Sequence, residues 1–135
     1  MATSIARLAR AIAYPDGVGD AAVSHVFRVD GAEMVAEERE GRLILRRNLA
    51  PDGGGPADLV ALAGYAAGRL LKEEAVLAWD PEAEMPFLWQ EISADAPDDR
   101  LCRFFEVFAT SVDWWAARLN DAVGISQIPE MMIRP

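Results

Sequence analysis

Two dipeptides that favour tight turns, Asp30-Gly31 and Glu40-Gly41, divide residues 22–49 into three runs of similar length. Within each run, side chains alternate with the period of two that is typical of a β-strand. A two-residue connection with glycine at its second position joins antiparallel strands that are neighbours in the sheet. The sequence therefore predicts a three-stranded antiparallel meander, and this constrains the fold more than any other feature.

The alternation also predicts which face of the meander is apolar. The other face mixes charged residues with Val26 and Ile44. Alternate side chains of a strand point to opposite faces, so one face is expected to pack on the core. The predicted inner residues are Val23, His25, Phe27, Val29, Met34, Ala36, Glu38, Leu43, Leu45 and Leu49.

Helical periodicity appears in three segments. The first helix is predicted over Ser4 to Ala13, before the turn-forming Tyr14-Pro15-Asp16-Gly17, and the second over Ala57 to Leu71. In the third, Pro97, Asp98 and Asp99 occupy the first turn, and the two aspartates suit a helix N-terminus. Its apolar stripe is the strongest periodic pattern in the chain: Leu101, Phe105, Phe108, Val112, Trp115 and Leu119.

A second hairpin is predicted between the second and third helices. Its strands are Ala75 to Trp79 and Met85 to Ile92, joined by five residues that contain Asp80, Glu82 and Glu84. These carboxylates lack the glycine and the terminal glutamate of a calcium loop, so a solvated hairpin tip is the preferred interpretation.

Together the segments predict an α+β fold with the order α-β-β-β-α-β-β-α, in which helices cover an antiparallel sheet. A chain of 135 residues that is 52% hydrophobic can bury one core, so a single domain is expected. We assign this domain to residues 1–124 and treat residues 125–135 as an apolar C-terminal tail, which is expected to dock on the protein's own surface.

Composition excludes some classes of partner. The formal net charge of −9 would repel a phosphate backbone, so nucleic acid is not an expected partner. No apolar run reaches the roughly 18 to 20 residues that a membrane span needs. The N-terminal segment lacks the apolar core of a signal peptide, so a cytoplasmic protein is expected.

The sequence offers little material for catalysis. His25 is the only histidine and lies on the predicted apolar face, and the only cysteine, Cys102, lies in a helical apolar pattern. Both are interpreted as structural residues, because a catalytic site needs several titratable groups that converge. We expect no catalytic residues, no cofactor and no metal site.

Large apolar side chains are more numerous than one thin sheet can cover. The chain has four tryptophans, with Met85 and Phe87 beside them, and an apolar C-terminal tail. Aromatic residues and methionine are enriched in binding surfaces. A protein interface is therefore expected, with completion of a monomer core as the alternative; the tryptophans are Trp79, Trp89, Trp114 and Trp115.

The order and spacing of these segments resemble those of the class I type III secretion chaperones, over nearly the whole chain. The resemblance is carried by short segments whose order matters more than any single motif. They are Phe27-Arg28-Val29-Asp30, Leu43-Ile44-Leu45, Leu77-Ala78-Trp79-Asp80, Met85-Pro86-Phe87-Leu88-Trp89, Phe105-Glu106-Val107-Phe108, Trp114-Trp115 and Leu119.

The resemblance implies a bacterial homodimer without enzymatic activity that holds the N-terminal chaperone-binding segment of a secreted effector. An extended segment can add a strand to a sheet edge, or place apolar side chains in grooves. By position, the effector-binding groove would contain Ile5, Leu8, Ile12, Val26 and Ile44. The dimer interface would contain Trp79, Trp89 and a stripe of small residues in the second helix: Ala57, Ala61, Gly64 and Gly68.

Alternatives stay open at this point. The small-residue stripe also suits close packing of the second helix on the sheet. The first helix is shorter than in most members of the family, and contact with the export apparatus is left open. A regulator of the same fold that binds a protein without a secreted client is the second hypothesis for function, and an enzyme acting on a small molecule is the third.

Overall fold

Both turns of the predicted meander adopt the left-handed backbone conformation that a tight hairpin requires. In the computed structural model, which describes residues 2–49 and 75–126, φ is 52° at Asp30 and 79° at Gly31. At the second turn φ is 52° at Glu40 and 76° at Gly41. A two-residue turn of this kind matches the twist of the strands that it joins. The three strands are β1 (Ser24–Val29), β2 (Ala32–Arg39) and β3 (Arg42–Asn48), which confirms the meander.

The second hairpin completes an antiparallel sheet of five strands. Its strands are β4 (Val76–Asp80), which begins and ends one residue later than predicted, and β5 (Met85–Ser93), which begins at the predicted residue and ends one residue later. The strand order is β1-β2-β3-β5-β4, so β5 rather than β4 lies beside the meander. The pairs Ile44↔Glu91 and Leu45↔Gln90 fix the register between β3 and β5.

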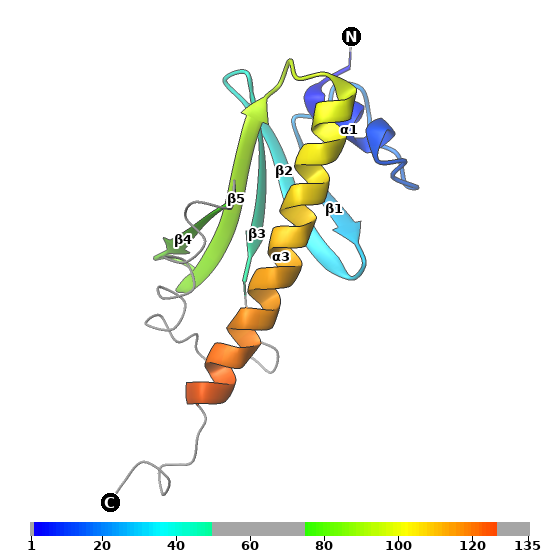
Figure 1. Ribbon diagram of the computed structural model, residues 1–135. Coiled ribbons are helices and arrows are strands. Elements are labelled where there is room, and N and C mark those ends of the chain that lie inside the picture. Colours follow the sequence, from blue (N-terminus) through cyan, green and yellow to red (C-terminus); the bar gives the residue numbers. More distant parts are fainter. Residues whose placement is uncertain (1, 50–74, 127–135) are drawn as a thin grey trace, which may run out of the picture.

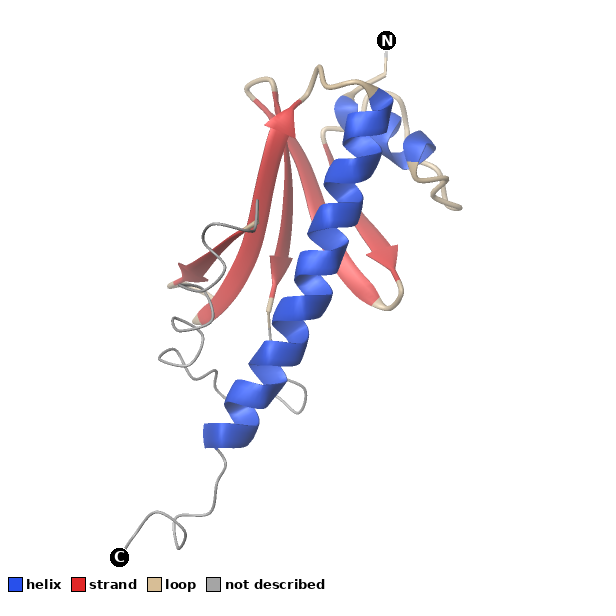
Figure 2. Ribbon diagram, viewed as in Figure 1, coloured by secondary structure: helices blue, strands red, loops and turns tan. Residues whose placement is uncertain are grey.

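One face of the sheet packs on two helices. Helix α1 (Ser4–Ala11) and helix α3 (Asp98–Ser126) both lie on this inner face, as Figure 1 shows, and the colouring of Figure 2 separates the helical layer from the sheet. The core residues are at most 8% exposed, and most of them come from the predicted inner positions of the meander and from the predicted helical stripes. They include Ile5, Leu8, Phe27, Met34, Ala36, Leu43, Leu45, Leu88, Leu101, Phe104, Phe105, Phe108, Val112 and Trp115.

Helix α1 begins at the predicted residue and ends two residues earlier than predicted. Thr3 is the N-cap, and its hydroxyl oxygen accepts a hydrogen bond from the Ala6 N–H. At the other end the N–H groups of Ala13 and Tyr14 donate to the carbonyl oxygens of Arg10 and Ala9. This pattern is a Schellman motif, and it places Ala13 at a φ of 55°. The helix therefore stops before Ala13.

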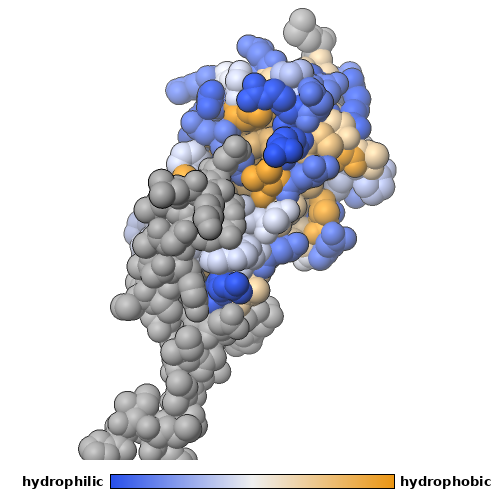
Figure 3. Space-filling view, viewed as in Figure 1, coloured by the Kyte–Doolittle hydropathy of each residue, from blue (hydrophilic) through white to orange (hydrophobic). Residues whose placement is uncertain are grey.

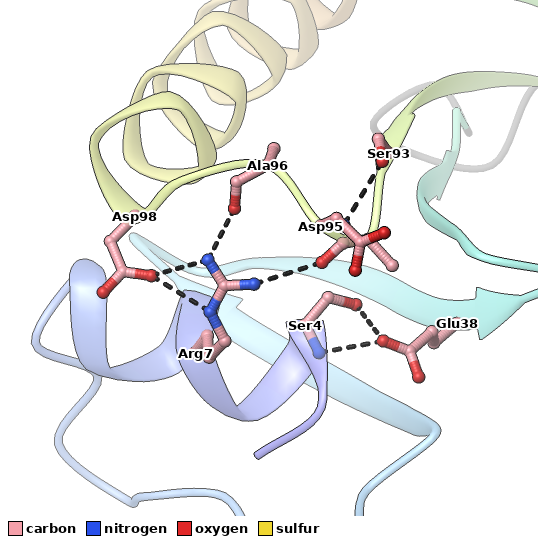
Figure 4. A network of polar contacts seen from close by, with 8 residues as sticks. Ser4, Arg7, Glu38, Ser93, Asp95, Ala96 and Asp98 are labelled. Atoms are coloured by element: carbon pink, nitrogen blue, oxygen red, sulfur yellow. Dashed lines mark hydrogen bonds and ion pairs between the residues drawn. The ribbon is translucent and has the colours of Figure 1, made fainter. Parts of the chain in front are cut away.

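Side-chain hydrogen bonds fasten α1 to the sheet and to the start of α3. The Arg7 guanidinium donates to the Asp98 carboxylate and to the carbonyl oxygens of Ala94 and Ala96, while the Ser4 N–H donates to Glu38 Oε1 at 2.8 Å (Figure 4). A carboxylate at a helix N-terminus is favourable because it meets unpaired N–H groups. The inward position of Glu38 agrees with the predicted alternation of β2.

Two predicted segments lie outside the described residues: the second helix and the C-terminal tail, except for Ile125 and Ser126, with which α3 ends. The side chain of Leu119, the last residue of the predicted stripe in α3, is also outside them. Phe104 lies outside the predicted stripe of α3 and still belongs to the core, at 4% exposed, whereas Val23, which was predicted to face inward, precedes β1 and is 59% exposed. Neither α1 nor the described part of α3 combines the length and the apolar character that a membrane-crossing helix needs.

Candidate functional site

The outer face of the sheet, opposite α1 and α3, carries an apolar row that crosses all five strands. Paired residues of neighbouring strands share a face, and the register aligns Val26 with Val35, Val35 with Arg46, Arg46 with Trp89, and Trp89 with Val76. Val26, Val35 and Val76 are 42–47% exposed. No described helix covers this face (Figure 1). We call these residues, with Ile44 and Phe87, the outer apolar face.

The centre of the outer apolar face is hollow. The cavity has a volume of about 260 Å³ and is open to solvent. Its walls combine aromatic and branched apolar side chains with charged ones, as binding pockets commonly do. The lining residues are Val35, Glu37, Arg39, Ile44, Arg46, Phe87 and Trp89.

Arg46 connects the hollow to the second hairpin. Its guanidinium carbon lies 3.9 Å from the centre of the Phe87 ring, and its Nη2 lies 2.7 Å from Asp80 Oδ2. An arginine held over an aromatic ring gains a cation–π interaction, and its methylene groups add apolar contact. Arg46 therefore extends the apolar surface between Val35 and Trp89 instead of interrupting it.

Ion pairs surround the outer apolar face. Arg28 pairs with Glu33 at 3.1 Å, and Arg42 pairs with Glu91 at 3.4 Å. Arg39 Nε also donates to Glu37 Oε1 at 3.0 Å. An apolar centre with a polar, solvent-exposed rim is the usual anatomy of a protein–protein interface.

Asp80 shapes the hairpin beside this face. Its Oδ1 accepts hydrogen bonds from the N–H groups of Glu82 and Ala83, at 3.0 and 3.2 Å. The hydrogen bond from Ala83 is the largest of the causes that lower the pKa of the Asp80 carboxyl, with smaller contributions from Glu82 and Arg46. The carboxylate thus stabilises the turn. In the described part of the chain, no cluster of histidine, cysteine and acidic residues could hold a metal ion.

The structure separates the residues of the predicted effector-binding groove. Ile5 and Leu8 lie on the inward side of α1 and are fully buried, and Ile12 is partly buried against the same core. Val26 and Ile44 lie on the outer face, because they alternate with the inward Phe27 and Leu45. The structure therefore does not bring the five residues together in one groove, and only Val26 and Ile44 belong to the outer apolar face.

The two tryptophans of the predicted dimer interface lie on opposite faces. Trp79 pairs with Pro86 on the helical side of the sheet and is 44% exposed, whereas Trp89 pairs with Arg46 on the outer side. Both still lie on the β4–β5 hairpin, and β4 is an edge strand. The other predicted interface residues, Ala57, Ala61, Gly64 and Gly68, lie outside the described residues.

His25 and Cys102, the histidine and the cysteine that were considered for catalysis, have surroundings that suit a structural role. The His25 ring packs edge-on against Tyr14 and Phe27, at centroid distances of 5.7 and 4.9 Å. Burial raises the pKa of the Cys102 thiol, and the neighbouring Glu106 carboxylate raises it further. A raised pKa makes a thiol a poorer nucleophile at neutral pH.

Sequence reasoning missed part of the outer apolar face. Val35 and Val76 were not among the candidate residues. Phe87 was named only among the surplus large apolar side chains and in one of the segments that carry the resemblance. The alternation that placed Val26 outward also places Val35 outward, so this residue could have been found. Val76 could not, because its position beside Trp89 depends on the register between β4 and β5.

The described elements form the fold of the class I type III secretion chaperones, which confirms the predicted resemblance at the level of the fold. Solved structures with this fold include chains of three complexes. A chain of the HopA1–SchA chaperone–effector complex has a TM-score of 0.61 at 20% identity, over 87% of this chain and 90% of that one. A chain of the ExoT–SpcS complex from Pseudomonas aeruginosa has a TM-score of 0.64 at 17% identity, over 82% and 91%.

The third similar structure is a chain of the ExsC–ExsE complex. Its TM-score is 0.65 at 16% identity, over 86% of this chain and 90% of that chain. No protein-family model matches the chain, and no curated protein sequence matches it. The likeness therefore lies in the backbone and not in the sequence.

Proposed function

We propose that this protein is a non-enzymatic, cytoplasmic chaperone of a bacterial type III secretion system, and that it binds the N-terminal chaperone-binding segment of an effector. Two observations support the proposal. All three similar structures come from two-protein complexes, and one of them is a chaperone–effector complex. The outer apolar face gives this chain a surface on which a second polypeptide can bury apolar side chains.

The outer apolar face is the observation that carries the proposal. Three valines from three strands are more than 40% exposed around a hollow lined by Ile44, Phe87 and Trp89. Covering apolar surface is favourable by about 25 cal/mol per Å². An effector segment that binds in an unfolded form would be stabilised by burying its apolar side chains on this face. The core of the chaperone would not have to change.

The protein is proposed to act as a homodimer that is joined at the edge formed by β4. Val76 is 47% exposed on the outer side of this edge strand, and Trp79 is 44% exposed on the helical side. An exposed strand edge with large apolar side chains readily pairs with another chain. A partner that contacts β4 from both sides would cover both residues.

The function is tested by purifying the tagged protein from the bacterium that encodes it and identifying bound proteins by mass spectrometry. We expect one or more secreted proteins, each cross-linked to the chaperone through its N-terminal region. The Val35→Glu variant should lose at least about 90% of the bound client, because a carboxylate in the centre of an apolar interface has to be desolvated. Val35 is half-exposed, so the fold should persist.

Thr110→Glu is the matched control, since it adds the same charge at an exposed position of α3, away from the outer apolar face. This variant should retain the client. Equal recovery of the client by both variants would show that the outer apolar face is not the binding site. Capture of a folded partner through a region other than its N-terminus would favour the regulator hypothesis.

A further inference from the structure

One edge of β5 extends beyond the strand that covers it. β5 has nine residues and β4 has five, and the pairing between them ends where Trp89 meets Val76. Residues 90–93 pair with β3 on one side. On the other side, no strand of the described residues pairs with them. Among the described strands, the sheet therefore has a short interior edge in addition to the outer edges of β1 and β4.

The hydrogen bonds between β3 and β5 show which residues of β5 direct their backbone N–H and C=O groups toward β3. The Pro86 carbonyl oxygen accepts from the Leu49 N–H, and the Ala94 N–H donates to the Gly41 carbonyl oxygen, so even-numbered residues of β5 face the β3 side. In an antiparallel strand the intervening residues direct their N–H and C=O groups to the opposite side. The backbone groups of Glu91 and Ser93 consequently point away from β3; the Ser93 carbonyl oxygen already accepts from the Ala96 N–H, which leaves both N–H groups and the Glu91 carbonyl oxygen for a partner.

A hollow of about 610 Å³ lies beside this edge. Ile92 from β5 and Phe104 and Val107 from α3 provide apolar walls, and Arg100 and Arg103 stand on the exposed side of α3. The side of the molecule that carries α1 and α3 displays hydrophobic patches between hydrophilic ones around the upper part of these helices (Figure 3). The hollow thus combines apolar contact with positive charge.

The charges of the hollow favour an acidic occupant. It contains three arginines and two carboxylates, and Arg42 is already paired with Glu91. Neither Arg100 nor Arg103 forms an ion pair with any described residue. Among the residues that line the hollow, these two arginines outnumber the one carboxylate that is not paired with Arg42, namely Asp95, although the whole chain is acidic.

The edge of β1 is less open at the corresponding place. The Arg28 N–H, which points away from β2, donates to the Tyr14 hydroxyl at 3.3 Å. This contact occupies one backbone donor of β1. The donors of Glu91 and Ser93 have no comparable partner among the described residues.

We propose that the uncovered edge of β5 binds an extended acidic segment of another polypeptide as an added strand. Alternate side chains of the segment would point toward α3, so that an apolar side chain contacts Ile92, Phe104 and Val107. Carboxylates two residues before and after it would meet Arg100 and Arg103. The site is separate from the outer apolar face, and the proposal does not depend on the function proposed above.

The probe is a capped synthetic peptide of about seven residues with the sequence Thr-Glu-Thr-Val-Thr-Glu-Thr. Titration of the isotope-labelled protein, followed by NMR, should shift the amide resonances of Glu91 and Ser93 and slow their hydrogen exchange at least about tenfold. The same peptide with lysine in place of glutamate should bind at least about tenfold more weakly, because it meets the arginines with like charge.

Backbone pairing is tested with two N-methylated forms of the acidic peptide. Methylation at one set of alternate residues removes the N–H groups that face β5, and methylation at the other set leaves them intact. Strand addition predicts that one form loses binding and the other retains it. Binding by both forms, or by neither, would overturn the proposal.

The arginines are tested with the double variant Arg100→Glu and Arg103→Glu, whose side chains are exposed, so the fold should be unaffected. We expect at least a tenfold loss of affinity for the acidic peptide, and no loss for Arg28→Glu on the distant strand β1. Equal affinity for both variants would refute the acidic site. Slow hydrogen exchange of the Glu91 and Ser93 amides without peptide would also refute it, because the edge would then already be paired. Exchange that slows with protein concentration would indicate pairing with a second copy, and exchange that is slow at every concentration would indicate pairing within the chain.

Discussion

At the scale of single residues, neighbours in the sequence have opposite environments because a strand presents its side chains to two faces. Phe27 is fully buried and contacts the rings of Tyr14, His25 and Phe105, whereas Val26 is 42% exposed on the outer apolar face. This difference decides which substitution affects stability and which affects binding.

Replacing Phe27 by alanine should lower the free energy of unfolding by about 3 to 5 kcal/mol, through lost burial and a residual cavity. Replacing Val26 by alanine should lower the free energy of unfolding by less than about 1 kcal/mol, because the side chain is 42% exposed and loses little buried area. Urea denaturation of both variants measures the difference. Similar losses would contradict the assignment of inner and outer faces.

The thiol of Cys102 should be protected from alkylation by its surroundings. Burial raises its pKa first, and the Glu106 carboxylate, 3.7 Å from the sulfur, raises it further. A higher pKa leaves less thiolate at a given pH, and the thiolate is the reactive form. The Glu106→Gln variant should therefore react faster with iodoacetamide at pH 8, whereas Glu91→Gln, remote from the thiol, should not change the rate.

At the scale of elements, α1 owes its position to one buried face and to a few polar contacts at its ends. Its apolar residues reach the core, and Arg7 reaches the loop between β5 and α3. The helix has only eight residues, so its own hydrogen bonds would be insufficient to keep it folded. Tertiary contacts must supply the remaining stability.

Replacing Arg7 by alanine should lower the free energy of unfolding by about 2 kcal/mol, because charged hydrogen bonds are lost and two carbonyl oxygens lose a donor. Replacing Arg10, whose pairing with Asp20 is exposed, should cost less than about 1 kcal/mol. Chemical denaturation gives both values, and limited proteolysis shows whether α1 is released. Equal losses for the two variants would mean that the Arg7 contacts do not anchor the helix.

Ala13 is a position where a smaller residue should stabilise the protein. It is exposed and adopts a φ of 55° at the end of α1, a conformation that costs an L-residue about 1 kcal/mol or more relative to glycine. Ala13→Gly should therefore raise the free energy of unfolding by up to about 1 kcal/mol. Ala13→Val should lower it. A loss of stability with glycine would show that α1 does not end in the Schellman motif.

At the scale of the whole molecule, one layer of helices covers one face of the sheet and leaves the other face to partners. The outer apolar face, the edge of β4 and the hollow beside β5 are three surfaces around the same sheet. A single small domain can thus be proposed to bind a twin and another polypeptide at once: Val76 belongs to both the outer apolar face and the β4 edge, but it does not line the hollow at the centre of that face.

Light scattering coupled to size-exclusion chromatography should give the mass of a dimer. Val76→Glu should shift the protein toward the monomer, since a charge would be placed in the proposed contact at β4. Ala83→Glu, at the exposed hairpin tip, should leave the dimer intact. A monomeric wild-type protein at micromolar concentration would contradict the proposed dimer. A dimeric Val76→Glu variant would show that the dimer interface does not lie at β4.

The local pattern of the sequence was sufficient to predict the meander, the second hairpin and both described helices. Alternation and helical spacing are properties of consecutive residues, and the turns Asp30-Gly31 and Glu40-Gly41 determine their own geometry. The inner faces followed for the same reason: Phe27, Leu45 and Phe108 were each placed in the core from spacing alone.

The binding surfaces were determined only by the tertiary structure. Nothing in the sequence near Ile5 or Leu8 shows that α1 lies on the side of the sheet opposite Val26 and Ile44, so the predicted groove joined residues from two faces. The insertion of β5 between β3 and β4 likewise brought Trp89 beside Arg46 and left Glu91 and Ser93 at an uncovered edge. Periodicity assigns a residue to a face of its own element, whereas long-range pairing decides which faces meet and which stay open.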